Sequence, residues 1–284
     1  MEVMKRDTAF EWLNHEIPRL TDGPAFFAVD DSEVLISGMP HTLLAALSFD
    51  EPAKIVDKLA ELRANLDLGM EFEFKWNQRG LASDVRAKIA VELRAALWNS
   101  FGLLTIVEGQ DRQRAAGYLA EQIADLVEGD VVPFVTFDEN IVRDHRAFRS
   151  FLLESGRQPM QRMQFSTARS FAHDLVQCAD VFAGFQNLSI RVVLGDAKDR
   201  LVPGDFEGEE LSLSFLLEAS FRYVLWGRNT VKVDPDWTSE EAPPPDWLYK
   251  ETEGLGLRIH STMPAETERL LYDNLGRPYM GCLH

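Results

Sequence analysis

Three apolar runs of this chain end on an acidic residue. The run 26–29 is followed by Asp30 and Asp31, and two later runs end at Glu108 and Asp138. Short apolar runs bounded by turn-forming residues are typical of buried strands. An acid at the carboxyl end of such a strand lies in the crevice where open α/β sheets bind ligands. The pattern therefore predicts a sheet whose strand ends carry carboxylates.

The order of the predicted elements constrains the fold class. Three short runs separated by turn residues predict a meander of strands, of which the third also suits a helix. Strands and helices then alternate, which together with the meander predicts an α/β fold with a mixed sheet flanked by helices. The predicted strands are 25–30, 34–38, 42–49, 103–107, 131–137 and 160–166, the segment 70–76 alternates apolar and charged residues, and the predicted helices include 83–98, 111–127, 140–153 and 170–185.

The segment 176–184, which reads V-Q-C-A-D-V-F-A-G, places one acid, Asp180, inside the last of these helices. At helical spacing, Asp180 borders a stripe of small residues that includes Ala179 and Ala183. Small residues let a helix approach a sheet closely, so this stripe would aim Asp180 at the strand ends. The alternative is an acid half exposed at the edge of a buried helix face.

Each of the other acids also has a structural alternative. Glu73 lies in an alternating segment that suits the solvated face of an edge strand. Asp138 suits the N-cap of the helix that follows it, and Asp30 suits a simple turn. Their combined placement favours a shared site, because two or three of them end core strands. Magnesium and manganese prefer carboxylate oxygens, and two such ions can activate a water and stabilise a leaving oxygen.

Composition limits the partners that such a site can have. The net charge is −17 and the pI is about 4.8, so the chain as a whole repels phosphate backbones. The two cysteines, Cys178 and Cys282, give neither a disulfide framework nor zinc spacing. The first residues do not resemble a signal peptide and no run is long enough to span a membrane, so we expect a cytoplasmic protein.

At these acids the chain resembles a large, mostly uncharacterised bacterial family of the ribonuclease H-like superfamily. The resemblance implies a ribonuclease H-like mixed five-stranded sheet in the order 3-2-1-4-5, with acids gathered near the first strand. Asp31 and Glu33 depart from the family pattern, which has glutamate and glycine there. The matching motifs are Asp30-Asp31-Ser32-Glu33, Glu73-Phe74-Lys75, Asp138-Glu139 and Gln177-Cys178-Ala179-Asp180 through Gly184.

Counting strands along the chain makes 103–107 the fourth strand, which in this layout neighbours the first. Glu108 then rivals Asp138 as a member of the site. We predict an N-terminal helix at 1–24, a ribonuclease H-like domain at 25–200, and a helical and extended C-terminal appendage at 201–284 that packs on the main domain.

The predicted function is that of a divalent-metal-dependent phosphodiesterase, a nuclease, that hydrolyses its substrate with metal-activated water. Asp30, Glu73 and Asp180, with Asp138 or Glu108, would hold Mg²⁺ or Mn²⁺. A nucleic acid is the expected substrate, although the acidic net charge disfavours it. The alternatives are a catalytically silent protein-interaction module and a small-molecule phosphohydrolase. Aromatic residues in the C-terminal part also leave homo-oligomer formation open, and they include Phe221, Trp226, Trp237, Trp247 and Tyr249.

Overall fold

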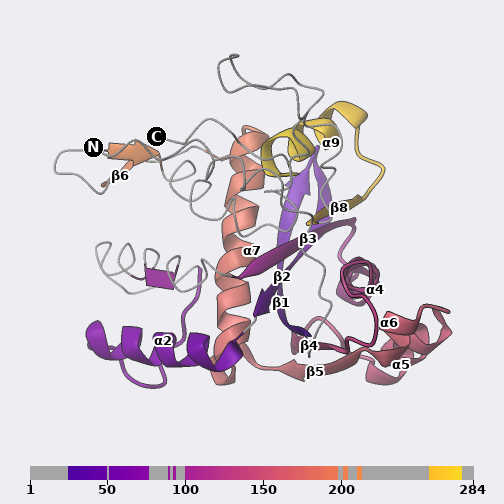
Figure 1. Cartoon of the computed structure of the whole chain (residues 1–284). Coiled ribbons are helices and arrows are strands. Elements are labelled where there is room, and N and C mark those ends of the chain that lie inside the picture. Colours follow the sequence, from indigo (N-terminus) through magenta and orange to yellow (C-terminus); the bar gives the residue numbers. More distant parts are fainter. Residues whose placement is uncertain are drawn as a thin grey trace, which may run out of the picture.

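A six-stranded mixed sheet lies at the centre of the computed structural model (Figure 1). The model describes residues 25–49, 51–76, 89, 92–93, 100–197, 201–203, 210–212 and 256–276, so the helix predicted at 1–24 and most of that predicted at 83–98 lie outside the described residues. The strands follow the spatial order β5-β4-β1-β2-β3-β8. Their bounds are β1 Ala25–Ile36, β2 Met39–Phe49, β3 Phe101–Glu108, β4 Pro133–Asp138, β5 Gln164–Ala168 and β8 Leu257–His260.

This order differs from the predicted five-stranded one. Strand β8 pairs in parallel with β3 and adds a sixth strand, with Leu257 opposite Leu104. The assignment of 103–107 as the fourth strand, next to the first, was also wrong. That segment lies in β3, which pairs antiparallel with β2, whereas β4 is the strand that lies parallel to β1. The count failed because β1 is one long strand where the turn residues predicted two.

Strand β1 continues through its acids instead of ending at them. It pairs antiparallel with β2 from Phe26 to Ile36, so the turn predicted at Asp31 and Ser32 does not form. The turn lies at Ser37 and Gly38, whose φ angles of 52° and 77° fit a two-residue hairpin. Pairing with β4 stops at Val29. Asp30 therefore lies where the parallel neighbour of β1 ends, although β1 itself goes on.

Helices cover both faces of the sheet. The long helix α7 packs on β1 and β2, while α4 packs on β2 and β3 from the opposite side (Figure 1). Alternate residues of β1 accordingly enter two separate cores, with Ala28 and Val34 facing α7 and Phe27 and Val29 facing α4. The helices are α2 Pro52–Asn65, α4 Arg112–Ala124, α5 His145–Glu154, α6 Gln158–Arg162, α7 Asp174–Val193 and α9 Ala265–Leu271.

Capping side chains explain where two of these helices begin. Asp111 accepts a hydrogen bond from the Arg114 amide at the start of α4, and Asp144 accepts from two amides at the start of α5. The remaining elements are short: the 3-10 helix η1 Ser170–Ala172, the hairpin pair β6 Leu201–Pro203 and β7 Glu210–Ser212, and the π-helical turn η3 Tyr272–Gly276. Within the described part of the chain, no helix is long and apolar enough to cross a membrane.

Candidate active site

One face of α7 holds a short segment that the alternation of the sequence predicted to be a strand. Residues 72–76, which we call the docked segment, have no strand partner in the described structure. Their backbone amides bind side chains of α7 instead: the Phe74 amide donates to Gln177 and the Trp76 amide donates to Asp180, each at 2.9 Å. The edge-strand prediction was wrong because these amides bond to a helix and not to a sheet.

The spacing of the Q-x-A-D-x-x-x-G motif explains this docking. Residues three and seven positions after Gln177 lie on the same side of a helix, which brings Asp180 and Gly184 under the docked segment. A Cβ atom on Gly184 would come within 2.2 Å of the Trp76 side chain. Only glycine therefore leaves room for the Trp76 ring at this point. The motif forms the face of α7 on which the docked segment lies, a role that its residue types and spacing did not reveal.

A buried polar group at the start of α7 fixes the other end of the docked segment. The Gln177 side chain is 1% exposed, accepts from Arg63 at 3.2 Å and donates to the Ser170 carbonyl at 3.0 Å. Arg63 in turn donates to the Phe72 carbonyl at 2.9 Å and forms an ion pair with Asp174 at 2.5 Å. Buried donors and acceptors that all have partners hold one geometry, because any displacement would leave a polar group unsatisfied.

The docked segment brings Glu73 and Lys75 next to Asp180. The Lys75 ammonium lies 3.1 Å from Glu73, and the Ser170 hydroxyl donates a short hydrogen bond to the same Glu73 oxygen. Burial raises the pKa of Asp180, and the charges of Glu73 and Asp138 act in the same direction. The Trp76 amide and Lys75 oppose this rise. Acids from three separate parts of the chain thus share one electrostatic environment.

Asp30 is the most strongly perturbed of these acids. Its side chain is 7% exposed on the α7 side of the sheet, and burial raises its pKa from 3.8 to about 8. The charge of Asp180 is the next cause, and Asp138 adds to it, while the Asp31 amide, 2.7 Å from an Asp30 oxygen, acts against them. A carboxyl group in these surroundings retains its proton at neutral pH unless a cation neutralises its neighbours.

The adjacent acid Asp31 faces the other core and has a cation beside it. Arg112, the first residue of α4, donates to Asp31 at 2.7 Å and to Glu33 at 3.2 Å. Burial still raises the pKa of Asp31, but the hydrogen bond and charge of Arg112 oppose that rise. The sequence reasoning missed Arg112. The sequence did contain a signal. The charge of an arginine in the first turn of a helix interacts unfavourably with the helix dipole, which suggests that an acidic side chain outside the helix pairs with it.

The structure separates the two rival acids, Asp138 and Glu108. Because Val29 pairs with Phe137 in parallel strands, Asp30 and Asp138 follow side by side, about 5 Å apart in backbone spacing. The Asp138 carboxylate accepts from the backbone and side chain of Asn140, both at 3.1 Å. Asp138 therefore lies with Asp30 and Asp180. We call Asp30, Glu73, Asp138 and Asp180 the acid cluster.

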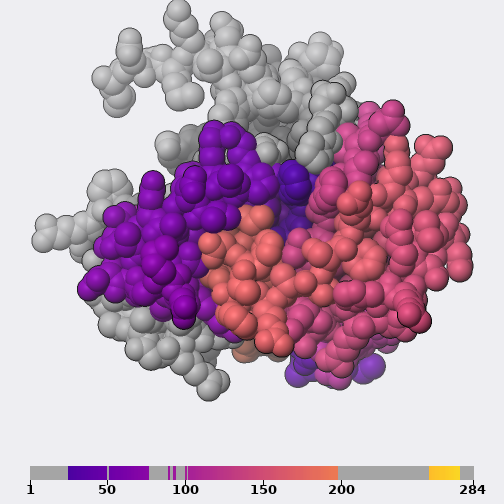
Figure 2. Space-filling model, turned by 90° about the horizontal axis from the view of Figure 1, so that it is seen from below, coloured from indigo at the N-terminus to yellow at the C-terminus, as the bar shows by residue number. Residues whose placement is uncertain are grey.

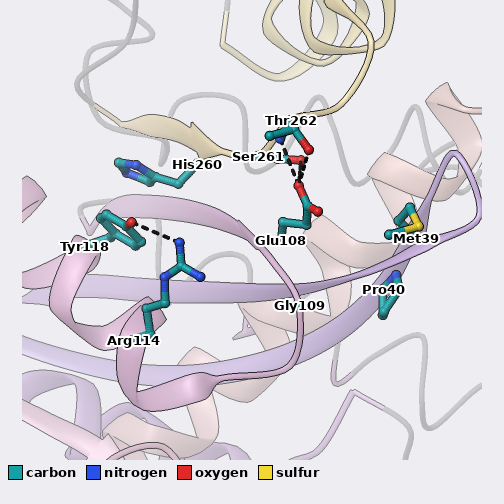
Figure 3. Close-up of a pocket in the computed structure, with 9 residues that line it drawn as sticks. All are labelled: Met39, Pro40, Glu108, Gly109, Arg114, Tyr118, His260, Ser261 and Thr262. Atoms are coloured by element: carbon teal, nitrogen blue, oxygen red, sulfur yellow. Dashed lines mark hydrogen bonds between the residues drawn. The ribbon is translucent and has the colours of Figure 1, made fainter.

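Glu108 lies two strands away from β1. Glu108 pairs with His41 of β2, and His41 pairs with Val34 of β1. Glu108 is therefore at the level of Val34 in the sheet, four residues along β1 from Asp30. It lines a pocket of about 520 Å³ in which its carboxylate accepts from the Thr262 amide at 2.9 Å and hydroxyl at 2.6 Å (Figure 3). These hydrogen bonds lower the pKa of Glu108. Glu108 fastens the segment after β8 to the end of β3.

The elements that carry the acid cluster meet at the end of the molecule where α7 begins. Figure 2 shows the first turns of α7 between the purple region of α2 and the docked segment on one side and the pink region of α5, α6 and β5 on the other. A small dark-blue area, the colour of β1, is visible between these regions. Distant parts of the sequence thus converge on one surface.

The chemistry of the acid cluster fits a hard divalent cation. Its four side chains offer only carboxylate oxygens, and Asp30 is buried among acids that repel its charge. As the side chains stand, no group of three histidine, cysteine or acidic residues in the described part of the chain is close enough together to hold a metal ion. Binding would therefore need rotation of the carboxylates toward one another.

Comparisons with known proteins leave the family open. No protein-family model matches the chain, and no curated protein matches it. Among solved structures, a chain of the PCNA:RNase HII complex from Archaeoglobus fulgidus is 13% identical, and the match covers 65% of this chain and 83% of that chain with a TM-score of 0.32. A TM-score this low carries no argument about fold or activity.

Proposed function

We propose that the chain is a divalent-metal-dependent phosphodiesterase, a nuclease, with a ribonuclease H-like arrangement. The observation that carries the proposal is Asp30, a buried carboxyl group beside Asp180 and Asp138. The order β3-β2-β1-β4-β5 within the larger sheet supports the arrangement, because it gathers the acids around β1. The register between β1 and β4 favours Asp138 over Glu108 as the fourth acid.

The residues of the acid cluster would bind the metal ions, and Lys75 and Ser170 would assist them. Asp30, Asp138 and Asp180 would hold Mg²⁺ or Mn²⁺, with Glu73 beside them on the docked segment. When bound, such ions supply an activated water and stabilise the leaving oxygen of a phosphodiester. Lys75 is half exposed next to Glu73 and lies where it could contact a phosphate oxygen. Ser170 keeps the Glu73 carboxylate in place.

A titration with Mn²⁺ tests the metal site. We expect Mn²⁺ to raise the melting temperature of the wild type and to leave that of an Asp30→Asn, Asp180→Asn double variant unchanged, because ligand binding to the folded state stabilises it. Asparagine retains an oxygen that can accept from the Trp76 amide, so docking is preserved. Glu108→Gln is the control and should respond as the wild type does. A double variant that responds like the wild type would overturn the proposal.

A small-molecule phosphohydrolase remains the second candidate, favoured by the net charge of −17, which repels long polyanions. Hydrolysis of a small chromogenic phosphodiester, compared with cleavage of labelled DNA and RNA oligonucleotides at equal Mn²⁺, separates the two. Activity on the small diester alone would favour this candidate. Lack of activity on every substrate, despite Mn²⁺ binding, would favour the catalytically silent interaction module.

A further inference from the structure

One region of the described structure is rich in arginine. Residues 143–169 contain six arginines, no lysine and only two acidic residues, in a chain whose net charge is −17. Three of these arginines have acidic partners: Arg157 pairs with Asp125, Arg162 with Asp130, and Arg169 with Glu139. The other three, Arg143, Arg146 and Arg149, we call the arginine stripe.

The arginine stripe has no acidic partner among the described residues, and all three side chains are exposed. Arg149 donates to the Met163 carbonyl at 2.8 Å, which leaves its charge unneutralised. Like charges one helical turn apart, as at Arg146 and Arg149, destabilise a helix slightly. The other three arginines in this region have acidic partners, so the stripe is a local exception to that pattern.

The arginine stripe begins at the same end of the sheet as the acid cluster. Arg143 follows Asp138 by five residues, and Arg146 and Arg149 are one helical turn apart on α5. The first turn of this helix contacts the edge strand β5, where the ring centroids of His145 and Phe165 lie 5.6 Å apart. Strand β5 pairs with β4 at Asp138, so it is only two strands from Asp30, about 10 Å in strand spacing.

We propose that the arginine stripe binds the phosphate backbone of a nucleic-acid strand that extends across the β5 edge toward the acid cluster. Guanidinium groups bind phosphates through paired hydrogen bonds, which a lysine ammonium cannot do, and the stripe contains only arginine. A protein with net charge −17 repels polyanions unless a cationic patch attracts them locally. The direction of the strand toward the acid cluster rests on the proposed function, whereas the binding itself does not.

The test is fluorescence anisotropy of labelled single-stranded and duplex oligonucleotides in buffer with EDTA at about 50 mM salt. The triple variant Arg143→Gln, Arg146→Gln, Arg149→Gln should bind about tenfold more weakly than the wild type, and the slope of log affinity against log salt should fall by about 2. The control Lys54→Gln, Lys58→Gln, Arg269→Gln removes the same charge from exposed positions on α2 and α9 and should change affinity less than about twofold.

Two further variants keep the result interpretable. If the triple variant melts early because the hydrogen bond from Arg149 to Met163 is lost, the double variant of Arg143 and Arg146 replaces it. The side chains of these two residues form no hydrogen bond or ion pair with another described residue. Replacing all three arginines with lysine keeps the charge and should weaken binding only partly. Equal losses in the stripe and control variants, or no binding by the wild type, would overturn the proposal.

The outcome is separable from that of the proposed function. Asp30→Asn should bind oligonucleotides at least as well as the wild type, because it removes a potential negative charge near the strand. Oligonucleotide binding through the stripe without any Mn²⁺ response would overturn the proposed function and leave the stripe standing. Mn²⁺-dependent cleavage of oligonucleotides that the triple variant binds and cleaves as well as the wild type does would overturn the stripe and leave the proposed function standing. A stripe variant that changes the sedimentation of the protein, but not oligonucleotide binding, would show a protein interface and overturn the proposal.

Discussion

Asp30 and Glu108 both occupy strands of the central sheet, but their surroundings differ in the donors that each one meets. Glu108 is solvated and accepts from the amide and hydroxyl of Thr262, which lower its pKa. Asp30 is buried and has one amide donor, from Asp31, against the charges of Asp180 and Asp138, so its pKa rises to about 8. The Glu108 carboxylate has its donors within the protein, whereas the acid cluster gains stability when Asp30 is protonated, and under the proposed function a bound cation would have the same effect.

The two sites also differ in how they are assembled. The Glu108 site needs only the segment after β8, which follows a strand of the same sheet. The acid cluster includes Glu73 of the docked segment, which is not part of the sheet. Hydrogen bonds to Gln177 and Asp180 of α7 hold this segment in position. A site that depends on side-chain docking of irregular backbone is sensitive to single changes on the helix, and the first prediction uses this difference.

Gly184→Ala should have the largest effect, because it removes the space for the Trp76 side chain. The added Cβ would lie 2.2 Å from the Trp76 Cγ and 2.4 Å from the Trp76 Cβ, and a change of side-chain rotamer does not move that Cβ. We expect a loss of about 3 kcal/mol in the free energy of unfolding, measured by urea denaturation. The Mn²⁺ response should weaken as well, since Glu73 moves with the docked segment.

Gly69→Ala is the matched control for this change. Gly69 precedes the docked segment, and no atom lies within 4 Å of the Cβ that alanine would add. Its effect should stay within about 0.5 kcal/mol. Equal effects at the two positions would mean that α7 does not hold the docked segment, and the contrast with the Glu108 site would disappear.

Asp30→Asn should stabilise the protein, and the gain should depend on pH. The folded-state pKa is about 8 and the ordinary value is 3.8, so between these values the folded protein keeps a proton that the unfolded chain releases. The stability of the wild type therefore falls as pH rises through this window. In EDTA at pH 8.5 we expect the variant to be more stable by about 3 kcal/mol, after discounting for relaxation of the buried site. Near pH 4 the difference should vanish.

A urea denaturation series from pH 4 to pH 9 measures this gain. Asp138→Asn serves as the comparison. It removes a charge that raises the pKa of Asp30, but it leaves the buried Asp30 carboxyl group in place. It should give a smaller gain over the same pH range. If Asp30→Asn is no more stable than the wild type at high pH, Asp30 is not the buried, repelled carboxyl group on which the comparison depends.

Local patterns in the sequence predicted elements well where the cause is local. Apolar spacing placed α7, and the apolar run before Glu108 placed β3. The same reasoning failed at Asp31 and Ser32, where pairing with β2 holds extended a segment that has turn composition. It failed again at 72–76, where the alternation of the residues was right but their partner was a helix. Both failures arise from contacts between distant residues, which spacing along the chain does not encode.

The site residues show the same difference between local patterns, which the sequence reveals, and contacts between separate segments, which it does not. Asp30 and Asp138 were named because they end apolar runs, and Asp180 because it borders a stripe of small residues on a helix. The structure gives the three carboxyl groups one electrostatic environment. Glu108 was named on equal grounds, and the structure places it elsewhere, because the register between β2 and β3 sets its level in the sheet. Arg112 was missed, because its position in the first turn of a helix suggested a partner but only the fold identifies that partner as Asp31.

Glu108→Gln should have the smallest effect and the opposite pH dependence to Asp30→Asn. Hydrogen bonds from Thr262 and Ser261 hold the pKa of Glu108 below its ordinary value of 4.5, so its carboxylate stabilises the fold above that pH. This contribution is lost as pH falls through the lowered pKa. The variant should therefore melt slightly below the wild type at pH 7 and together with it at the lowest pH at which both fold. Thr262→Ala, which removes the donating hydroxyl, should reproduce the deficit at pH 7. If Glu108→Gln stabilised the protein instead, the Glu108 carboxylate would destabilise the fold as that of Asp30 does. The hydrogen-bond donors would then not explain a difference between the two acids.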